Sequence, residues 1–121
     1  MEEEIARKPY ATSDIFLESR MQIYYYGMLT FGYFQAERYD HKIERAVETL
    51  SDFYLCYPEC RFLETKSQKY RNIILDSHII IYRIADKYIE VLDIIHTSSS
   101  ISKIQNVRKI HINYNKNQNN E

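Results

Sequence analysis

The chain contains few of the residues that mark special structural classes. Its 121 residues include no tryptophan, two cysteines, two prolines and two glycines. Two cysteines are too few for a disulfide framework, which favours a reducing compartment, the cytoplasm. Cys56 and Cys60 would need two further ligands to hold zinc, so we predict no metal and no cofactor.

Long apolar runs and a strong charge of either sign are also missing. No apolar run approaches the ~20 residues that a membrane span requires, and the start Met1-Glu2-Glu3-Glu4 is acidic, unlike that of a signal peptide. The formal net charge is −1, without the basic excess typical of nucleic-acid-binding proteins. A local basic patch is still compatible with this total.

The overall composition of the chain is typical of a globular domain. Hydrophobic residues make up 45% and charged residues 27%, as in ordinary folded proteins. We predict a single domain over residues 8–112 and a disordered polar tail over 113–121. Twelve tyrosines are present; they suit either core filling or a binding interface.

The first half of the chain predicts a short strand and two helices. Pro9 cannot donate a backbone hydrogen bond, so a strand over residues 7–13 should lie at a sheet edge. Ser13 or Asp14 should cap a helix that ends near Gly32. One apolar face of this helix, with spacings of four, three and four, consists of Leu17, Met21, Tyr24 and Met28.

The second predicted helix covers residues 34–55 and is closed by Pro58. Its apolar stripe is Ala36, Tyr39, Ile43, Val47, Leu50 and Tyr54. Its opposite face mixes acidic and basic residues and should be solvated. Because very few residues join the two helices, they should form an antiparallel hairpin.

The second half changes to the alternation of strands. We expect strands at Cys60–Thr65, Tyr70–Asp76, His78–Ile84 and Tyr88–Ile95, with His78–Ile84 in a central position. A short helix should follow near residues 101–107, capped by a serine. The predicted fold class is α+β: a helical hairpin packed on a small antiparallel sheet in the order β-α-α-β-β-β, with a short C-terminal helix.

Several stretches together resemble a family of bacterial toxins. The stretches are "KPYATS", "FGYFQAERY", "YPECR" and "YRNIILDSHIIIYRIADKYIEVLDIIH". In order and spacing, over about Lys8 to Lys103, they resemble the RelE/ParE superfamily of type II toxin–antitoxin modules, and its ParE branch most. This resemblance implies a helical hairpin on a sheet and a cleft bound by a ParD-like antitoxin, in an assembly such as a heterotetramer. It also implies inhibition of DNA gyrase by binding, and a role in plasmid stabilisation.

The resemblance leaves an enzymatic alternative, a ribosome-dependent mRNA interferase. Such a ribonuclease needs an acid, a base and cations for the developing phosphorane charge. Arg71, Arg83 and His96 are the candidates, but Thr97–Ser100 stand where the superfamily commonly carries an arginine. Alternation along a strand also separates Tyr82 from Arg83. We therefore predict no enzyme, and a decayed non-toxic copy is a third interpretation.

Each candidate also has a structural interpretation. Arg71 or Arg83 could pair with Glu90 or Asp93 across the sheet, and His96 could be a hydrogen-bonded structural histidine. Tyr82 could belong partly to the core.

A binding function requires a surface instead of a catalytic constellation. The predicted target-binding residues are Arg71, Tyr82, Arg83, His96, Lys103, Arg108 and Lys109. The last three belong to residues 98–112, the one locally basic segment, which could alternatively pack on the sheet and cover an edge. Antitoxin should bind between hairpin and sheet, and its predicted contacts are Tyr25, Tyr26, Phe31 and Phe34.

Overall fold

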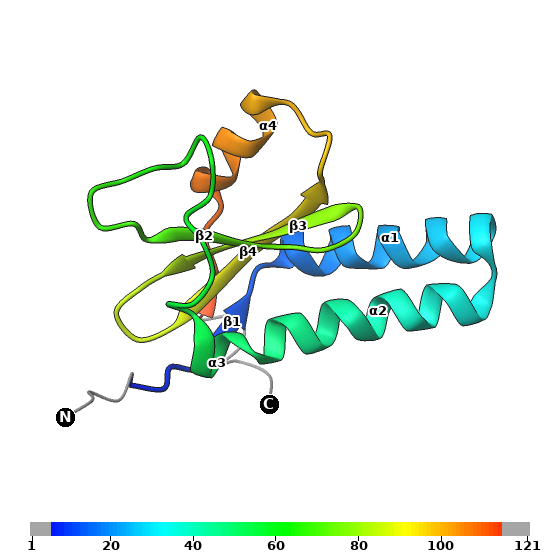
Figure 1. The fold of residues 1–121 in the computed structure, drawn as a ribbon, viewed down its shortest axis with the longest axis horizontal. Helices are drawn as coiled ribbons and strands as arrows, with labels where there is room; N and C mark the ends of the chain where they lie inside the picture. The colour runs from blue at the N-terminus through cyan, green and yellow to red at the C-terminus, as the bar shows by residue number, and fades with distance from the viewer. Residues whose placement is uncertain (1–5, 115–121) are drawn as a thin grey trace.

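A four-stranded sheet lies between two covering layers (Figure 1). The computed structural model describes residues 6–114, so residues 1–5 and the part of the predicted tail from 115 to 121 lie outside it. The strands are β1 (Tyr10–Thr12), β2 (Tyr70–Ile74), β3 (His78–Ile84) and β4 (Ile89–His96). The helices are α1 (Asp14–Phe31), α2 (Tyr33–Glu48), α3 (Leu50–Phe53), α4 (Ile101–Asn106) and the 3-10 turn η1 (Val107–Lys109). This is the predicted α+β architecture.

The sheet has the strand order β1-β4-β3-β2. β2, β3 and β4 form the expected antiparallel meander, while β1 lies at the edge, as predicted, and pairs parallel to β4. A bulge interrupts β4: Tyr82 pairs with Val91, but Ile81 pairs with Asp93. The shift of one residue brings His78 opposite His96 at the end of the sheet.

The main core lies between the helical hairpin and the sheet. Its buried members from the helices are Phe16, Ile43, Val47, Leu50 and Tyr54, and those from the strands are Ile73, Ile80, Tyr82, Ile89, Val91 and Ile94. The stripe predicted for the second helix is therefore confirmed, with Tyr39 packed partly buried at its margin. Thr49 divides the predicted single helix into α2 and α3.

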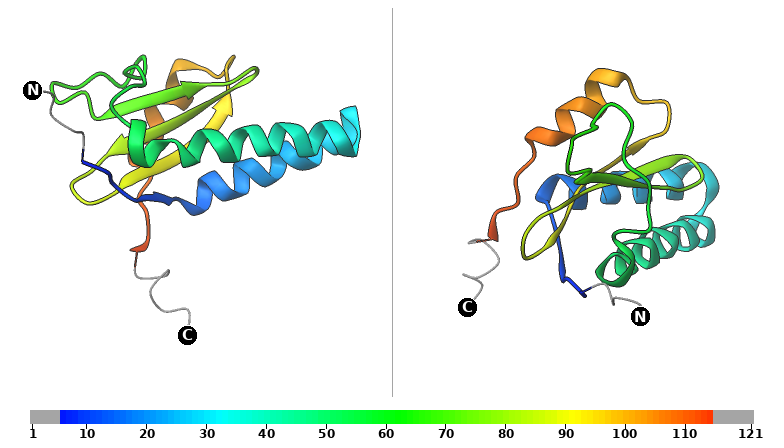
Figure 2. Two further views of the ribbon diagram at one scale, coloured as in Figure 1. Left: turned by 60° about the horizontal axis from the view of Figure 1, so that its bottom comes forward. Right: turned by 60° about the vertical axis from the view of Figure 1, so that its left-hand side comes forward.

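α4 lies on the face of the sheet opposite the helical hairpin, as the side views show (Figure 2). A second, smaller core is buried on that face. Its members are Cys60, Leu63, Tyr70, Ile81, Leu92, Ile95, Ile104 and Val107. The last two come from α4 and η1, so the basic C-terminal segment packs on the sheet. It covers a face of the sheet, where the sequence suggested an edge.

The apolar face predicted for the first helix does not point into the core. Phe16 is fully buried, whereas Leu17, Met21 and Met28 are exposed. α1 is apolar around most of its circumference, so residue spacing alone does not determine which face is buried. Contacts with β4 determine it instead, because the Ser13 hydroxyl both caps α1 at the Phe16 N–H and donates to the Leu92 carbonyl.

The strand predicted at Cys60–Thr65 is absent. This segment forms turns, and one bridging pair, Glu59 with Arg71, connects the neighbouring residues to β2. Phe62 adopts φ +69°, a left-handed conformation that ends an extended run. Its apolar residues fit a strand pattern because Cys60 and Leu63 are buried by the second core.

Candidate partner-binding groove

The helical hairpin projects beyond the end of the sheet (Figure 1). A groove of about 660 Å³ lies between the hairpin and the ends of β3 and β4. The hairpin lines it with apolar side chains, including Ile23, Tyr26, Phe31 and Ile43. The other wall comes from the ends of β3 and β4 and from α4, with His78, Ile94, Ile95, His96 and Lys103. An apolar concavity with a few polar groups at one end is suited to ligand or segment binding.

Two histidines lie together at the sheet end of the groove. The His78 and His96 rings are 5.5 Å apart between centroids, edge to face. His78 Nδ1 shares a 2.8 Å hydrogen bond with the Tyr39 hydroxyl, and burial together with His96 lowers the pKa of His78. His78 should therefore be neutral near pH 7.

His96 is held by its neighbour Ser98. The Ser98 N–H donates to His96 Nδ1 at 3.1 Å, and the Ser98 hydroxyl is 2.7 Å from the same nitrogen. An Nδ1 that accepts leaves the proton of the neutral ring on Nε2. The exposed His96 ring therefore offers one donor at Nε2.

The charged side chains of the groove are unevenly neutralised. Asp40 receives two hydrogen bonds from Arg20, at 2.8 and 3.0 Å, and Asp76 is 3.0 Å from Lys42. Lys103 is exposed, and among residues 6–114 no carboxylate lies within ion-pair distance of it. Lys103 is thus the one exposed cation among the described lining residues at the sheet end of the groove, and the nearby Asp93 carboxylate partly offsets its charge.

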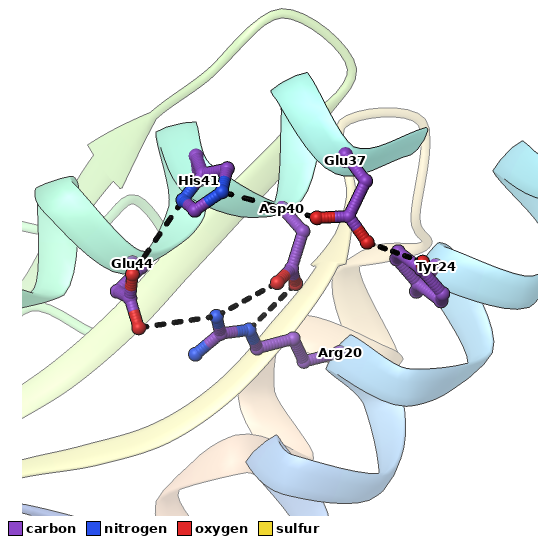
Figure 3. A network of polar contacts seen from close by, with 6 residues as sticks. All are labelled: Arg20, Tyr24, Glu37, Asp40, His41 and Glu44. Atoms are coloured by element: carbon purple, nitrogen blue, oxygen red, sulfur yellow. Dashed lines mark hydrogen bonds and ion pairs between the residues drawn. The ribbon is translucent and has the colours of Figure 1, made fainter. Parts of the chain in front are cut away.

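Polar contacts between α1 and α2 hold the helical wall together (Figure 3). Arg20 joins Asp40 and approaches Glu44 at 3.9 Å, while the Tyr24 hydroxyl donates to Glu37. The bond to Glu37 is the main cause that raises the pKa of Tyr24 to about 12. These contacts indicate a preformed groove wall.

Gly27 permits close approach of the two helices. A Cβ atom at this position of α1 would lie 3.5 Å from the Ala36 Cβ of α2, so the two backbones pass each other with small residues between them. The seam of the hairpin is therefore tight at this level.

The candidate catalytic residues do not converge. Arg71 donates to the backbone carbonyls of Leu55, Tyr57 and Gln68, which fixes the loop before β2. Arg83 pairs with Glu90 at 2.7 Å, the cross-strand pair that the structural interpretation foresaw.

The strand geometry keeps these arginines away from His96. Arg83 is five residues along β3 from His78, the partner of His96, a separation of about 17 Å. Arg71 pairs with Tyr82, next to Arg83 and similarly far from the strand end. Tyr82 has no exposed surface and donates to the Tyr54 carbonyl. The side chains of Arg71, Arg83 and Tyr82 are therefore engaged in contacts that stabilise the fold.

The remaining predicted target-binding residues occupy two places. His96 and Lys103 line the groove. Arg108 and Lys109 are exposed on η1, where the Arg108 carbonyl accepts a hydrogen bond from Arg83.

The four predicted antitoxin contacts are all exposed, with exposed fractions from 56% for Tyr25 to 81% for Phe34. Tyr26 and Phe31 line the groove, whereas Tyr25 and Phe34 lie outside its lining. Tyr39 and His78 are groove residues that sequence reasoning did not assign to a site. His78 could have been identified because it begins the strand that pairs with the end of β4. The bulge that places it directly opposite His96, however, cannot be recognised in the sequence.

Neither a cluster of metal ligands nor a membrane-spanning helix occurs in the described part of the chain. Among residues 6–114, no three or more side chains of the types that ligate metals gather in one place. Within the same residues, no helix has both the length and the hydropathy needed to cross a membrane.

The fold is a small α+β domain with an apolar groove between its helical hairpin and the end of its sheet. The sequence matches the family "ParE toxin of type II toxin-antitoxin system, parDE" over residues 11–101. The chain therefore belongs to the ParE toxin family of type II toxin–antitoxin systems.

A solved structure agrees with this fold. The "Chromosomal ParDE TA system from P. aeruginosa" includes a chain that superposes with a TM-score of 0.64 at 17% identity, covering 76% of this chain and 98% of that chain. A search of the curated proteins gives no significant match.

Proposed function

We propose that this toxin inhibits DNA gyrase by binding, and that a cognate antitoxin neutralises it by occupying the groove. The observation that carries the proposal is the groove itself, an apolar concavity whose sheet end holds His96 and Lys103. The toxin would act in the cytoplasm, as part of a toxin–antitoxin assembly such as a heterotetramer.

Binding is favoured over RNA cleavage by the state of the arginines. A ribonuclease would need cations directed at one phosphate. Arg83 is engaged by Glu90 and Arg71 by three carbonyls, both far from His96 along the sheet. A binding surface needs only a few well-placed anchors.

Neutralisation follows from the position of two target-binding candidates. His96 and Lys103 lie inside the groove, so a segment that fills the groove would cover them. Arg108 and Lys109 lie outside its lining and would stay accessible for a weaker, electrostatic contact with the gyrase–DNA complex. One event, occupation of the groove, would then remove the central part of the target surface.

The antitoxin segment should be amphipathic. Its apolar side would pack on Tyr26 and Phe31, and an acidic residue would meet Lys103. Phe34, and Tyr25 on the far side of α1, would be reached only by a segment that continues past the hairpin tip.

The test is supercoiling by purified gyrase in the presence of this protein and of its Lys103→Glu variant, with Lys66→Glu as a control at an exposed residue outside the groove. We expect inhibition by the parent and the control, and at least a tenfold higher concentration requirement for Lys103→Glu, since reversing a contact charge costs more than about 1.4 kcal/mol. Addition of antitoxin should restore supercoiling.

Unchanged supercoiling at high toxin concentration would overturn the proposal. Cleavage of mRNA in translating ribosomes would replace it with the interferase, and no effect in either assay would indicate the decayed copy.

A further inference from the structure

The layer that covers the second face of the sheet is strongly basic. It consists of residues 59–71, which lead into and begin β2, and residues 101–114, which include α4 and η1; we call it the basic layer. Leu63 from the first segment meets Ile104 and Val107 from the second in the smaller core, and the views agree in placing the two segments side by side (Figure 1, Figure 2). The basic layer is therefore one continuous surface.

The charge of the basic layer is opposite to that of the helices on the other face. With histidines counted as neutral, the layer contains seven lysines and arginines and two glutamates, a formal charge of +5. Residues 14–53, from α1 to α3, contain four basic and seven acidic residues, a formal charge of −3. The near-neutral total of the chain is therefore compatible with one strongly positive face.

The cations of the basic layer are exposed and lack acidic partners. Six of its seven basic residues are exposed, and within residues 6–114 none of the seven lies within ion-pair distance of a carboxylate. Asp93 partly offsets Lys103. Of the two glutamates of the layer, Glu59 accepts a hydrogen bond from a backbone N–H at 2.9 Å, and Glu64 is exposed. Most of the positive charge is therefore available to a polyanion.

Contacts around Tyr70 bring cations of the two segments together. Lys69 Nζ lies 5.5 Å from the centre of the Tyr70 ring. The Arg83 guanidinium donates to the Tyr70 hydroxyl and to the Arg108 carbonyl, each at 3.4 Å. Lys69 and Arg108 therefore both adjoin the same ring, although 39 positions separate them in the chain.

We propose that the basic layer binds the phosphate backbone of duplex DNA. An array of exposed cations without acidic partners is suited to phosphates. A protein partner would need apolar anchors, and among the residues of the layer, all of which the structure describes, Ile101 is the one large apolar side chain that is exposed. A single strand would need exposed rings for base stacking, whereas Phe62 and Tyr114 are half-buried and Tyr70 is buried.

The binding itself requires neither gyrase nor antitoxin. The layer lies on the face of the sheet opposite the helical hairpin, and of its residues only Lys103 lines the groove. A chain whose groove is occupied should therefore still bind DNA. The choice of DNA over duplex RNA rests on the proposed function, because gyrase acts on DNA.

The test titrates a short labelled DNA duplex with the full chain, in the absence of gyrase, and follows fluorescence anisotropy at salt from about 50 to about 200 mM. We expect saturable binding at the lowest salt, and a slope of about −4 for the logarithm of the binding constant against that of the salt concentration, as for contacts with about four phosphates. Arg61→Gln with Arg108→Gln should weaken binding about tenfold and reduce the magnitude of the slope by about 2.

The matched control is Arg38→Gln with Arg45→Gln. These are two exposed arginines of α2, so the control loses the same charge from the opposite side of the molecule and should keep the slope of the parent. Circular dichroism checks the fold of each variant. Lys109→Gln alone, at another exposed position, should reduce the magnitude of the slope by about 1 and gives a second measure.

Absence of binding at about 50 mM salt, or an equal loss of affinity in the two double variants, would overturn the proposal. An RNA duplex that displaces the label at lower concentration than a DNA duplex would overturn the choice of DNA. The gyrase assay tests the other claim separately. A chain that binds DNA without inhibiting gyrase contradicts the proposed function and supports this inference, and a chain that inhibits gyrase without binding DNA overturns this inference alone.

Discussion

Some basic side chains of this protein make hydrogen bonds that hold the fold together, and others are exposed in the groove. Arg71 and Arg83 direct their donors to backbone carbonyls and to Glu90. Lys103 and His96 reach the groove from the end of the sheet. A substitution at the first pair should thus change stability first, and one at the second pair should change binding first.

The pair of Arg83 and Glu90 gives the first prediction. Their side chains are only 13% and 11% exposed, and Glu90 also accepts from the Tyr114 hydroxyl. Glu90→Gln removes the charge that compensates Arg83, so it should lower the free energy of unfolding by about 3 kcal/mol. Urea denaturation measures this loss. A variant that keeps its stability but loses toxicity would instead place Arg83 in the target surface.

The protonation of His78 gives the second prediction. Its pKa in the folded chain lies below the ordinary 6.5, mainly because of burial and next because of His96. The unfolded chain therefore binds more protons between these two pKa values, so stability rises with pH there and is lost as pH falls below about 6.5. Urea midpoints across this range should fall toward acid, and less so in His78→Asn. Parallel curves for the parent and the variant would contradict this assignment.

At the scale of elements, the helical hairpin forms one wall of the groove. Gly32 alone connects α1 to α2, and the seam between them is held by Arg20 with Asp40 and by Tyr24 with Glu37. One side of the hairpin lines the groove. The turn between the helices is therefore important for the shape of the groove.

The two glycines of the chain give a matched pair of variants. Gly32 has φ +95° and ψ 169°, a region that is essentially restricted to glycine, so Gly32→Ala should cost about 1–3 kcal/mol. Gly27 is inside α1, and an added methyl group would meet Ala36 at 3.5 Å, an ordinary contact. Gly27→Ala should therefore be neutral or stabilise by up to about 1 kcal/mol. Thermal unfolding of both variants compares them, and an equal effect of the two would refute this account of the turn.

Sequence patterns determined some elements better than others. α2 was predictable because its apolar residues recur on one face while charged residues occupy the other. The buried face of α1 was not predictable, since its own apolar residues point in all directions and the face predicted to be buried is exposed. Cys60–Thr65 resembled a strand because two of its apolar residues are buried, although the segment turns at Phe62.

At the scale of the whole molecule, both faces of the sheet are covered. The helices bury one face, while the loop before β2 together with α4 and η1 buries the other. The basic C-terminal segment thus combines two roles: Ile104 and Val107 belong to the second core, and Lys103 faces the groove. Sequence reasoning treated these roles as rivals, but neighbouring residues on a short helix point in different directions and can serve both.

This double role gives the fourth prediction. Truncation after His96 should prevent stable folding, because it uncovers Ile81, Leu92 and Ile95. Ile104→Ala should cost about 2–5 kcal/mol, whereas Lys103→Glu at an exposed site should leave the unfolding free energy within about 0.5 kcal/mol. Chemical denaturation compares the three. A truncated chain with native stability would show that the segment is not part of the core.

The candidate site was predictable only in part. His96, Lys103, Tyr26 and Phe31 were all proposed from the sequence, and the structure brings them to one groove. His78 joins them through a one-residue shift of the β4 register, which depends on packing of the whole sheet. Arg71 and Arg83 were proposed because of their residue type, but their partners come from other segments that residue spacing does not identify.

The most direct measurement is plasmid supercoiling by purified gyrase, run beside a translation reaction in which mRNA integrity is followed. With this chain present, supercoiling should stop, it should resume when antitoxin is added, and the mRNA should remain intact. Full gyrase activity together with mRNA cut at the ribosome would contradict the central claim.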